Sequence, residues 1–176
     1  MNGHPGGIEH TRRLLELAEL PVGASVLDMG AGAGETLALL RSLGFTAEGI
    51  DLAPRSAEVE KGDFLCAPFP DGGFDAVISQ CAFFVSGDQR AALREANRLL
   101  KSGGRLLLSD LFFEAPEPLL RSAGFSLLHA EDMTPLWREY FFEALWRDGA
   151  PCCAVPKGKS SYWLLIAGKE KQDGHL

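Results

Sequence analysis

Three glycines at alternate positions, Gly30, Gly32 and Gly34, constrain this chain more than any other feature. They follow an apolar segment at 25–28 that predicts a strand, and they precede a segment at 35–43 whose apolar spacing predicts a helix. Glycines let the backbone turn tightly and approach a ligand without an intervening side chain. A strand, a glycine turn and a helix in this order are typical of the edge where parallel sheets bind ligands, although a purely structural turn has the same signature.

Strands and helices alternate along the rest of the chain. Apolar runs predict six further strands, at 45–50, 58–61, 74–79, 105–109, 125–130 and 161–167. Apolar spacing and capping residues predict helices at 8–20, 88–100, 118–123 and 135–147, one helical turn from Pro54, an N-cap at Asp88 and a turn at 101–104. This alternation implies a mostly parallel sheet with helices on both faces.

The composition narrows the class of protein. With 176 residues, 46% of them hydrophobic and 23% charged, the chain is expected to form one soluble domain. No apolar run approaches the roughly 20 residues that span a bilayer, and 1–7 lacks the features of a signal peptide, so we expect a cytoplasmic protein without a membrane partner. The net charge of −7 argues against nucleic acid as a partner. The four cysteines lack the spacing of a zinc site, so we expect free thiols and no metal.

Two well-known phosphate-binding turns fail at particular residues. A dinucleotide-binding G-x-G-x-x-G turn needs a third glycine at position 35 or 37, where this chain has Glu35 and Leu37. A Walker loop needs Lys followed by Ser or Thr after its last glycine, and here Glu35 and Thr36 follow Gly34. A nicotinamide-dependent oxidoreductase is therefore disfavoured.

The pattern Asp28-x-Gly30-x-Gly32-x-Gly34 instead resembles the first signature motif of the class I S-adenosylmethionine-dependent methyltransferases, in particular their small type 11 and type 25 members. The resemblance implies that the glycines admit the methionyl part of the cofactor and that Asp28 accepts hydrogen bonds from its amino group. Asp51 lies 17 residues after Gly34, where the family places the acid that binds both ribose hydroxyls. Leu52 would then lie against the adenine.

Further segments extend the resemblance in the family's order. Residues 62–64 match the element in which Asp63 accepts a hydrogen bond from the adenine amino group, and 74–80 match the strand that brings Gln80 to the methionyl amine. Residues 98–108 match the following helix, turn and fifth strand. Each segment alone has an ordinary structural explanation, and their order and spacing carry the inference. The implied cofactor is S-adenosylmethionine, with S-adenosylhomocysteine as product, and the implied cofactor-binding residues are Asp28, Gly30, Gly32, Gly34, Asp51, Leu52, Asp63, Phe64 and Gln80.

The family also implies a fold. We expect an α/β, Rossmann-like, seven-stranded, mostly parallel sheet with helices on both faces and an antiparallel last strand. Residues 1–176 would form a single methyltransferase domain. Within it, 1–24 would be an N-terminal helix and lid, 25–110 the cofactor-binding half, 111–170 the substrate-side half and 171–176 a disordered tail.

The acceptor side is less well defined, because only 110–117 separate the fifth strand from the next helix. A lid must then come from 4–7 or from the aromatic-rich segment 133–159, and a homodimer in which each copy covers the other is also considered. The candidate acceptor-side residues are Phe83, Phe84, Asp110 and Tyr140. The face formed by Trp137, Tyr140, Phe141 and Ala144 favours core packing.

No catalytic residue is assigned from the sequence. The available bases are Asp110, Glu114, His129 and Tyr140, whereas His4, His10 and His175 are expected to be solvated. The main hypothesis is methyl transfer to a small-molecule acceptor, because the base-modifying motif that many nucleic-acid methyltransferases carry is absent at 80–84. A catalytically weak cofactor-binding or scaffold protein is the alternative. Arsenic binding through Cys81, Cys152 and Cys153 is disfavoured by their spacing.

Overall fold

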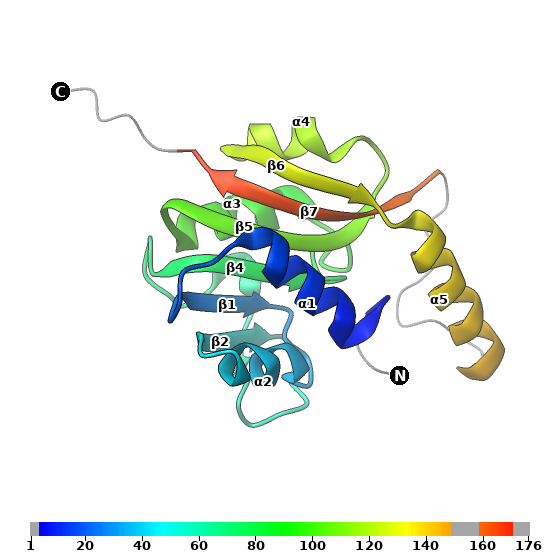
Figure 1. Cartoon of the computed structure of the whole chain (residues 1–176), viewed down its shortest axis with the longest axis horizontal. Coiled ribbons are helices and arrows are strands. Elements are labelled where there is room, and N and C mark those ends of the chain that lie inside the picture. The colour runs from blue at the N-terminus through cyan, green and yellow to red at the C-terminus, as the bar shows by residue number, and fades with distance from the viewer. Residues whose placement is uncertain (1–3, 149–158, 171–176) are drawn as a thin grey trace.

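The computed structural model describes residues 4–148 and 159–170 (Figure 1). Within these residues one seven-stranded sheet has the order β3-β2-β1-β4-β5-β7-β6. The strands are β1 (Ser25–Met29), β2 (Thr46–Asp51), β3 (Glu60–Lys61), β4 (Phe74–Gln80), β5 (Leu100–Phe112), β6 (Phe125–Asp132) and β7 (Ser161–Lys169). From β3 to β5 every pairing is parallel, and β7 pairs antiparallel with both β5 and β6. The predicted Rossmann-like fold with an antiparallel last strand is confirmed.

The described residues also form five α-helices and one short 3-10 helix, of which α1 precedes the first strand. They are α1 (Gly7–Ala18), α2 (Glu35–Ser42), η1 (Phe64–Cys66), α3 (Gln89–Leu99), α4 (Pro116–Ser122) and α5 (Thr134–Asp148). The Asp88 carboxylate accepts a hydrogen bond from the Ala91 N–H at 2.9 Å, which confirms the predicted N-cap of α3. Among these described residues, no helix is both long and apolar enough to cross a membrane.

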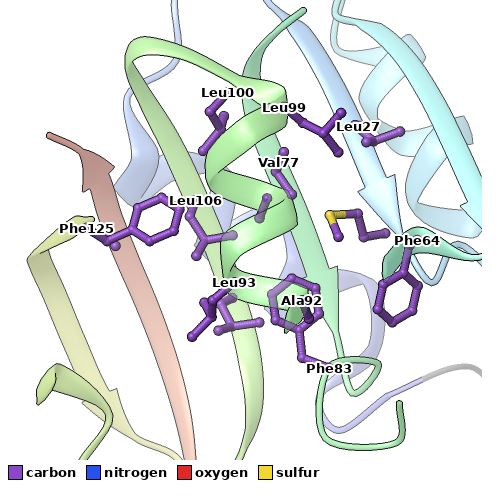
Figure 2. Close-up of a cluster of buried hydrophobic side chains, with 14 of the residues drawn as sticks. Leu27, Phe64, Val77, Phe83, Ala92, Leu93, Leu99, Leu100, Leu106 and Phe125 are labelled. Atoms are coloured by element: carbon purple, nitrogen blue, oxygen red, sulfur yellow. The ribbon is translucent and has the colours of Figure 1, made fainter. Parts of the chain in front are cut away.

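Helices cover both faces of the sheet. Apolar residues of α1 and α2, including Leu14 and Leu40, pack on one face, and those of α3 and α4 pack on the other. In Figure 1, α1 lies on the near face and α3 on the far face. Figure 2 shows the second of these clusters between α3 and the sheet, with Phe64 and Phe83 near one end. Both faces of the central strands are therefore buried, as their apolar runs predict.

Two local predictions are wrong, each for a long-range reason. The turn beginning at Pro54 is not helical, because the Arg55 N–H donates to the Gly32 carbonyl at 2.8 Å and ties this segment to the first loop. The turn predicted at 101–104 is part of β5, which starts at Leu100 opposite Phe74 and absorbs the extra residues in a register shift. Helix η1 was not predicted, and Asp63 caps it.

Candidate functional site

A cavity of about 650 Å³ lies at the carboxyl ends of β1, β2 and β4. Loops after these strands and after β3 form most of it, and the start of α1 adds another wall. The cavity brings together eight of the nine residues predicted to bind a cofactor: Asp28, Gly30, Gly32, Asp51, Leu52, Asp63, Phe64 and Gln80. Gly34 is not in its lining and instead occupies the N-cap position of α2, with a φ of 80°. The predicted residues thus meet at the carboxyl ends of the parallel strands, the edge of the sheet where the glycine turn indicated a ligand site.

Backbone conformation explains the first glycine of the turn. Gly30 has a φ of 91°, which an L side chain rarely adopts. A Cβ at this position would lie 2.3 Å from the Cβ of Ala82 in the loop after β4. The N–H groups of Gly30 and Ala31 both donate to the Ile50 carbonyl, at 2.9 and 3.2 Å. The turn is therefore pinned to β2 and closely packed against the loop after β4.

Asp51 joins two loops of the cavity. Its Oδ2 accepts a hydrogen bond from the Gly32 N–H at 2.9 Å, and its Oδ1 accepts one from the Ala53 N–H at 2.8 Å. These two bonds fix the orientation of the carboxylate at the end of β2. Leu52, the next residue, is 61% exposed at the rim of the cavity, so its side chain is accessible to a flat ligand.

Asp63 and Phe64 are held by the short helix that they begin. The Oδ1 of Asp63 accepts a hydrogen bond from the Leu65 N–H at 2.8 Å. Phe64 is largely buried, and its ring centroid lies 5.8 Å from that of Phe83. Phe83 is fully buried in the core and does not line the cavity, so it supports Phe64 instead of reaching the acceptor side.

The carboxylate of Asp28 is the most perturbed group in the cavity. It lies near the end of β1 and is 4% exposed. Burial, and secondly the negative charge of Asp51, raise the pKa of Asp28 from 3.8 to about 7. A ligand that brings a positive charge to this carboxylate would therefore relieve a considerable electrostatic cost.

Gln80 links the sheet to the helices above it. Its Oε1 accepts hydrogen bonds from the hydroxyls of Thr11 on α1, at 3.1 Å, and of Thr36 on α2, at 3.4 Å. Its Nε2 lies 3.4 Å from the Nδ1 of His4, whose other ring nitrogen lies 3.2 Å from the Thr11 hydroxyl. Burial lowers the pKa of His4 below its ordinary value. This network holds His4 and the start of α1 against the cavity.

The prediction that His4 and His10 are solvated is wrong. His4 and Ile8 line the cavity, so residues at and just before the start of α1 form part of its wall. His10 is 5% exposed, and its Nε2 lies 2.7 Å from the Ser109 hydroxyl on β5. Burial, followed by the nearby His4, lowers the pKa of His10 to about 4. Helix α1 presents His10 on its buried side, and His4 precedes the helix; His175 lies outside the described residues.

The other acceptor-side candidates lie outside the lining of this cavity. The Oδ2 of Asp110 accepts a hydrogen bond from the Phe84 N–H at 2.9 Å, and its Oδ1 accepts one from the Leu111 N–H at 2.8 Å. Burial raises the pKa of Asp110 to about 7, against the opposing effect of these backbone hydrogen bonds. The ring of Phe84 packs on Phe113 at 5.8 Å. Asp110 therefore anchors the loop after β4 from below the cavity.

Helix α5 packs mainly through the face predicted for it. Trp137 and Phe141 are each 7% exposed, Ala144 is fully buried, and Tyr140 is half-buried. The prediction of core packing for Trp137, Phe141 and Ala144 is confirmed, and Trp137 and Phe141 share a cluster with Tyr162 of β7. The part of 133–159 that could form a second lid includes 149–158, which lie outside the described residues together with Cys152 and Cys153.

Sequence reasoning missed several residues of the cavity. Besides His4 and Ile8, the lining includes Glu35, Arg55 and Val85. Arg55 comes from the loop after β2, and its guanidinium lies 3.1 Å from where a Cβ of Gly32 would be. The short loop after Asp51 could have suggested Arg55, whereas His4 was included only in the candidate lid at 4–7 and was expected to be solvated. In the described part of the chain, no cluster of three His, Cys, Asp or Glu side chains is arranged to hold a metal.

Comparison with known proteins agrees with this geometry. Residues 27–108 match the family model described as a methyltransferase domain. The resemblance to the class I methyltransferases is confirmed. The chain is 27% identical, over an alignment of 206 positions, to phosphoethanolamine N-methyltransferase of Triticum aestivum, covering 96% of this chain and 39% of that protein. It is 35% identical over 115 residues to demethylmenaquinone methyltransferase of Thermus thermophilus, covering 56% of this chain and 52% of that protein.

Solved structures share the fold at low sequence identity. The [4+2]-cyclase SpnF matches with a TM-score of 0.74 and 22% identity, over 93% of this chain and 80% of that one. Phosphoethanolamine N-methyltransferase 2 of Haemonchus contortus, solved in complex with S-adenosyl-L-methionine, matches with a TM-score of 0.74 and 19% identity, over 96% of this chain and 54% of that one. The chain thus spans 39% and 52% of the lengths of the two curated relatives named above.

Proposed function

We propose that this chain transfers the methyl group of S-adenosylmethionine to a small-molecule acceptor. The observation that carries the proposal is the convergence of Asp28, Asp51 and Asp63 with the glycine turn on a single cavity. Three carboxylates around a glycine turn suit a ligand that carries an amine, a pair of hydroxyls and a purine amino group. They do not suit a polyphosphate, which they would repel.

Each carboxylate has a distinct proposed role. Asp51, already oriented by two backbone N–H groups, would accept hydrogen bonds from the ribose hydroxyls with its remaining lone pairs. Asp63, oriented by the hydrogen bond from the Leu65 N–H, would accept a hydrogen bond from the adenine amino group. Leu52 and Phe64 would lie beside the adenine ring. Asp28 and the Gln80 side chain would face the amino group of the methionyl part.

The protein's contribution to the reaction is then alignment and exclusion of water. S-adenosylmethionine, when bound, supplies an already activated methyl group. The walls formed by His4 before α1, by Ile8 on α1 and by Cys81 after β4 would bring an acceptor into line and shield the reacting atoms. Because the donor is activated, positioning is the main catalytic requirement.

A small-molecule acceptor agrees with the form of the site. His4 and Ile8 form one wall of the cavity, and such a wall would admit a short, free acceptor more readily than a loop of a folded macromolecule. The relatives named for phosphoethanolamine and demethylmenaquinone methylation also act on small molecules, by their names. A catalytically weak cofactor-binding or scaffold protein is the alternative function, and the transfer experiment below distinguishes the two.

Calorimetric titration with S-adenosylhomocysteine tests cofactor binding. Asp51→Asn should weaken binding by about 100-fold, because it removes the charge and one of two acceptor atoms. Glu48→Gln is the matched control, since Glu48 is an exposed carboxylate on the same strand, and it should leave binding unchanged. The absence of binding by the unaltered protein would refute the proposal.

A second experiment tests transfer and the size of the acceptor. The protein is incubated with methyl-labelled S-adenosylmethionine and either the dialysable or the macromolecular fraction of a cell extract. Label should enter products of the dialysable fraction. Label found only in macromolecules would overturn the proposed acceptor class, and cofactor binding without any transfer would favour the scaffold.

A further inference from the structure

A chain of four polar side chains runs from the cavity into the core. The Cys81 sulfur lies 3.4 Å from the Tyr162 hydroxyl. Tyr162 is also hydrogen-bonded to Ser109, whose hydroxyl lies 2.7 Å from the Nε2 of His10. These residues come from four separate parts of the fold: the loop after β4, then β7, β5 and α1. Such an arrangement is expensive to bury unless each polar atom has a partner.

Cys81 is the member of the chain that lines the cavity. Tyr162 and Ser109 are fully buried and His10 is 5% exposed, so the chain is closed to solvent behind the sulfur. Cys81 directly follows Gln80 and has a φ of 56°, an uncommon conformation for a residue other than glycine. Its N–H donates to the Ser109 carbonyl at 2.8 Å, which fixes the backbone there.

The hydrogen-bonding protons of these four side chains can be assigned in order, from the buried His10 to Cys81 at the cavity. His10 is neutral near pH 7 because its pKa lies at about 4, so one ring nitrogen carries a proton. In one consistent arrangement, His10 Nε2–H donates to the Ser109 hydroxyl and the Ser109 hydroxyl donates to the Tyr162 oxygen. The Tyr162 hydroxyl then donates to the Cys81 sulfur, and each donor is used once. Donors aligned in this way stabilise a thiolate more than a thiol.

Other ionisable groups face this chain. The ring centroid of His4, which precedes α1, lies 6.3 Å from that of His10, and Asp110 on β5 interacts electrostatically with Tyr162. On α2, Glu35 lines the same cavity and interacts with His4. The negative charges of Asp110 and Glu35 disfavour ionisation of Cys81, so the hydrogen bonds from Tyr162, Ser109 and His10 must stabilise the thiolate by more than these charges destabilise it.

We propose that the Cys81 thiolate accepts the proton of the methyl acceptor, with Tyr162, Ser109 and His10 as the residues that position and stabilise it. This inference rests on the proposed methyl transfer. The acceptor atom forms a bond to the methyl carbon while the bond from that carbon to the sulfonium sulfur breaks. The acceptor's proton moves to the Cys81 sulfur, so a neutral acceptor, a sulfonium and a thiolate become a methylated product, a thioether and a thiol. The thiol then releases its proton to solvent before the next turnover.

The bases considered from the sequence are placed less favourably. Asp110 is held by backbone N–H groups below the cavity, and His129 pairs with Glu131 on β6 at 2.8 Å. Glu114 lines a separate cavity of about 420 Å³ next to α3 and α4. Tyr140 is absent from the lining of the main cavity. Cys81 combines access to the cavity with a buried set of donors behind it.

Alkylation of Cys81 by iodoacetamide tests the donor chain without requiring a cofactor or an acceptor. The rate is measured across pH 6 to 10 by peptide mass spectrometry, with the exposed Cys66 as an internal reference. Tyr162→Phe removes only the hydroxyl and should move the pH midpoint of Cys81 alkylation upward by about one unit, as expected for losing one donor to a charged acceptor. Ser109→Ala should move it in the same direction.

The controls separate the chain from general loosening of the fold. Ser126→Ala removes an exposed hydroxyl on β6 and should leave both cysteines unchanged. His10→Gln keeps an N–H donor and should preserve the midpoint, whereas His10→Leu should raise it. A Cys81 midpoint in Tyr162→Phe that equals the wild-type value, or shifts together with that of Cys66, overturns the proposal.

The transfer assay with the dialysable extract fraction tests the role of the sulfur itself. Cys81→Ala should bind S-adenosylhomocysteine like the wild type and transfer label about 100-fold more slowly, the lower end of what a general base contributes. Tyr162→Phe should move the alkaline-rising limb of the rate to higher pH. Equal rates for Cys81→Ala and wild type would overturn the assignment. Failure of the wild type to bind or transfer would instead refute the proposed function, and the alkylation experiment would still report on the chain.

Discussion

Asp28→Asn should have opposite effects on stability and on cofactor binding. Burial raises the pKa of Asp28 from 3.8 to about 7 in the folded protein. Between about pH 4 and pH 7 the unfolded chain has released this proton while the folded chain retains it, so the stability contributed by Asp28 falls as the pH rises. The three-unit difference corresponds to about 4 kcal/mol, all of which is lost above pH 7.

Asparagine keeps the shape of the side chain and cannot ionise. The variant should therefore have the wild-type free energy of unfolding near pH 4 and exceed it at pH 8, by at most about 4 kcal/mol. Urea denaturation at several pH values measures this difference directly. A variant that is less stable than the wild type at pH 8 would refute the assigned cost of the buried charge.

Cofactor binding should respond in the other direction. A bound amino group favours the ionised form of Asp28, so lowering the pH protonates the carboxylate and opposes binding. With a pKa of about 7, wild-type affinity for S-adenosylhomocysteine should fall about tenfold between pH 8 and pH 6. Asp28→Asn should bind more weakly at pH 8 and show a flatter pH dependence. Parallel pH profiles for the two proteins would show that Asp28 does not face the amine.

Three further outcomes follow from the geometry. Gly30→Ala places a Cβ 2.3 Å from that of Ala82 and should destabilise the protein by more than about 2 kcal/mol in urea denaturation, whereas Gly23→Ala, where a Cβ meets open space at a similarly positive φ, should cost about 1 kcal/mol; equal losses would contradict the packing argument. The folded pKa of His10 is about 4, below its ordinary value of 6.5, so stability should decline by up to about 3 kcal/mol as the pH falls from 6.5 to 4, and a wild-type decline matched by His10→Gln would count against this origin. Arg98→Ala should lower the thermal midpoint, with a loss of about 2 kcal/mol, because Arg98 donates to two backbone carbonyls as well as two carboxylates; an unchanged midpoint would mean that water replaces these bonds.

The order of the elements and the cofactor motif could be predicted because their signals are local. Apolar periodicity, the glycine turn and the Asp88 cap each lie within a few residues of the structure they specify. Parallel strands place their following loops at one edge, so Asp51 and Asp63 were expected near the glycines without any knowledge of distances.

Long-range contacts explain what could not be predicted. The hydrogen bond between His10 and Ser109 joins residues 99 positions apart, and the sequence around each residue gives no signal of this contact. Phe83 follows β4 by a few residues, which suggested access to the acceptor, but the chain there turns back into the core against Phe64. The helical turn predicted from Pro54 does not form, because the Arg55 N–H donates to the Gly32 carbonyl in the glycine turn. This hydrogen bond requires β1 and β2 to be adjacent.

The direction of β7 has a practical consequence for work with this protein. Because β7 runs against its neighbours, Lys169 at its end pairs with Phe125 at the edge of the sheet opposite the cavity. The start of α1, by contrast, lies in the cavity wall through His4 and Ile8. An affinity tag appended after the last residue should therefore leave ligand binding undisturbed, whereas one fused before Met1 begins only a few residues from the ligand's entrance.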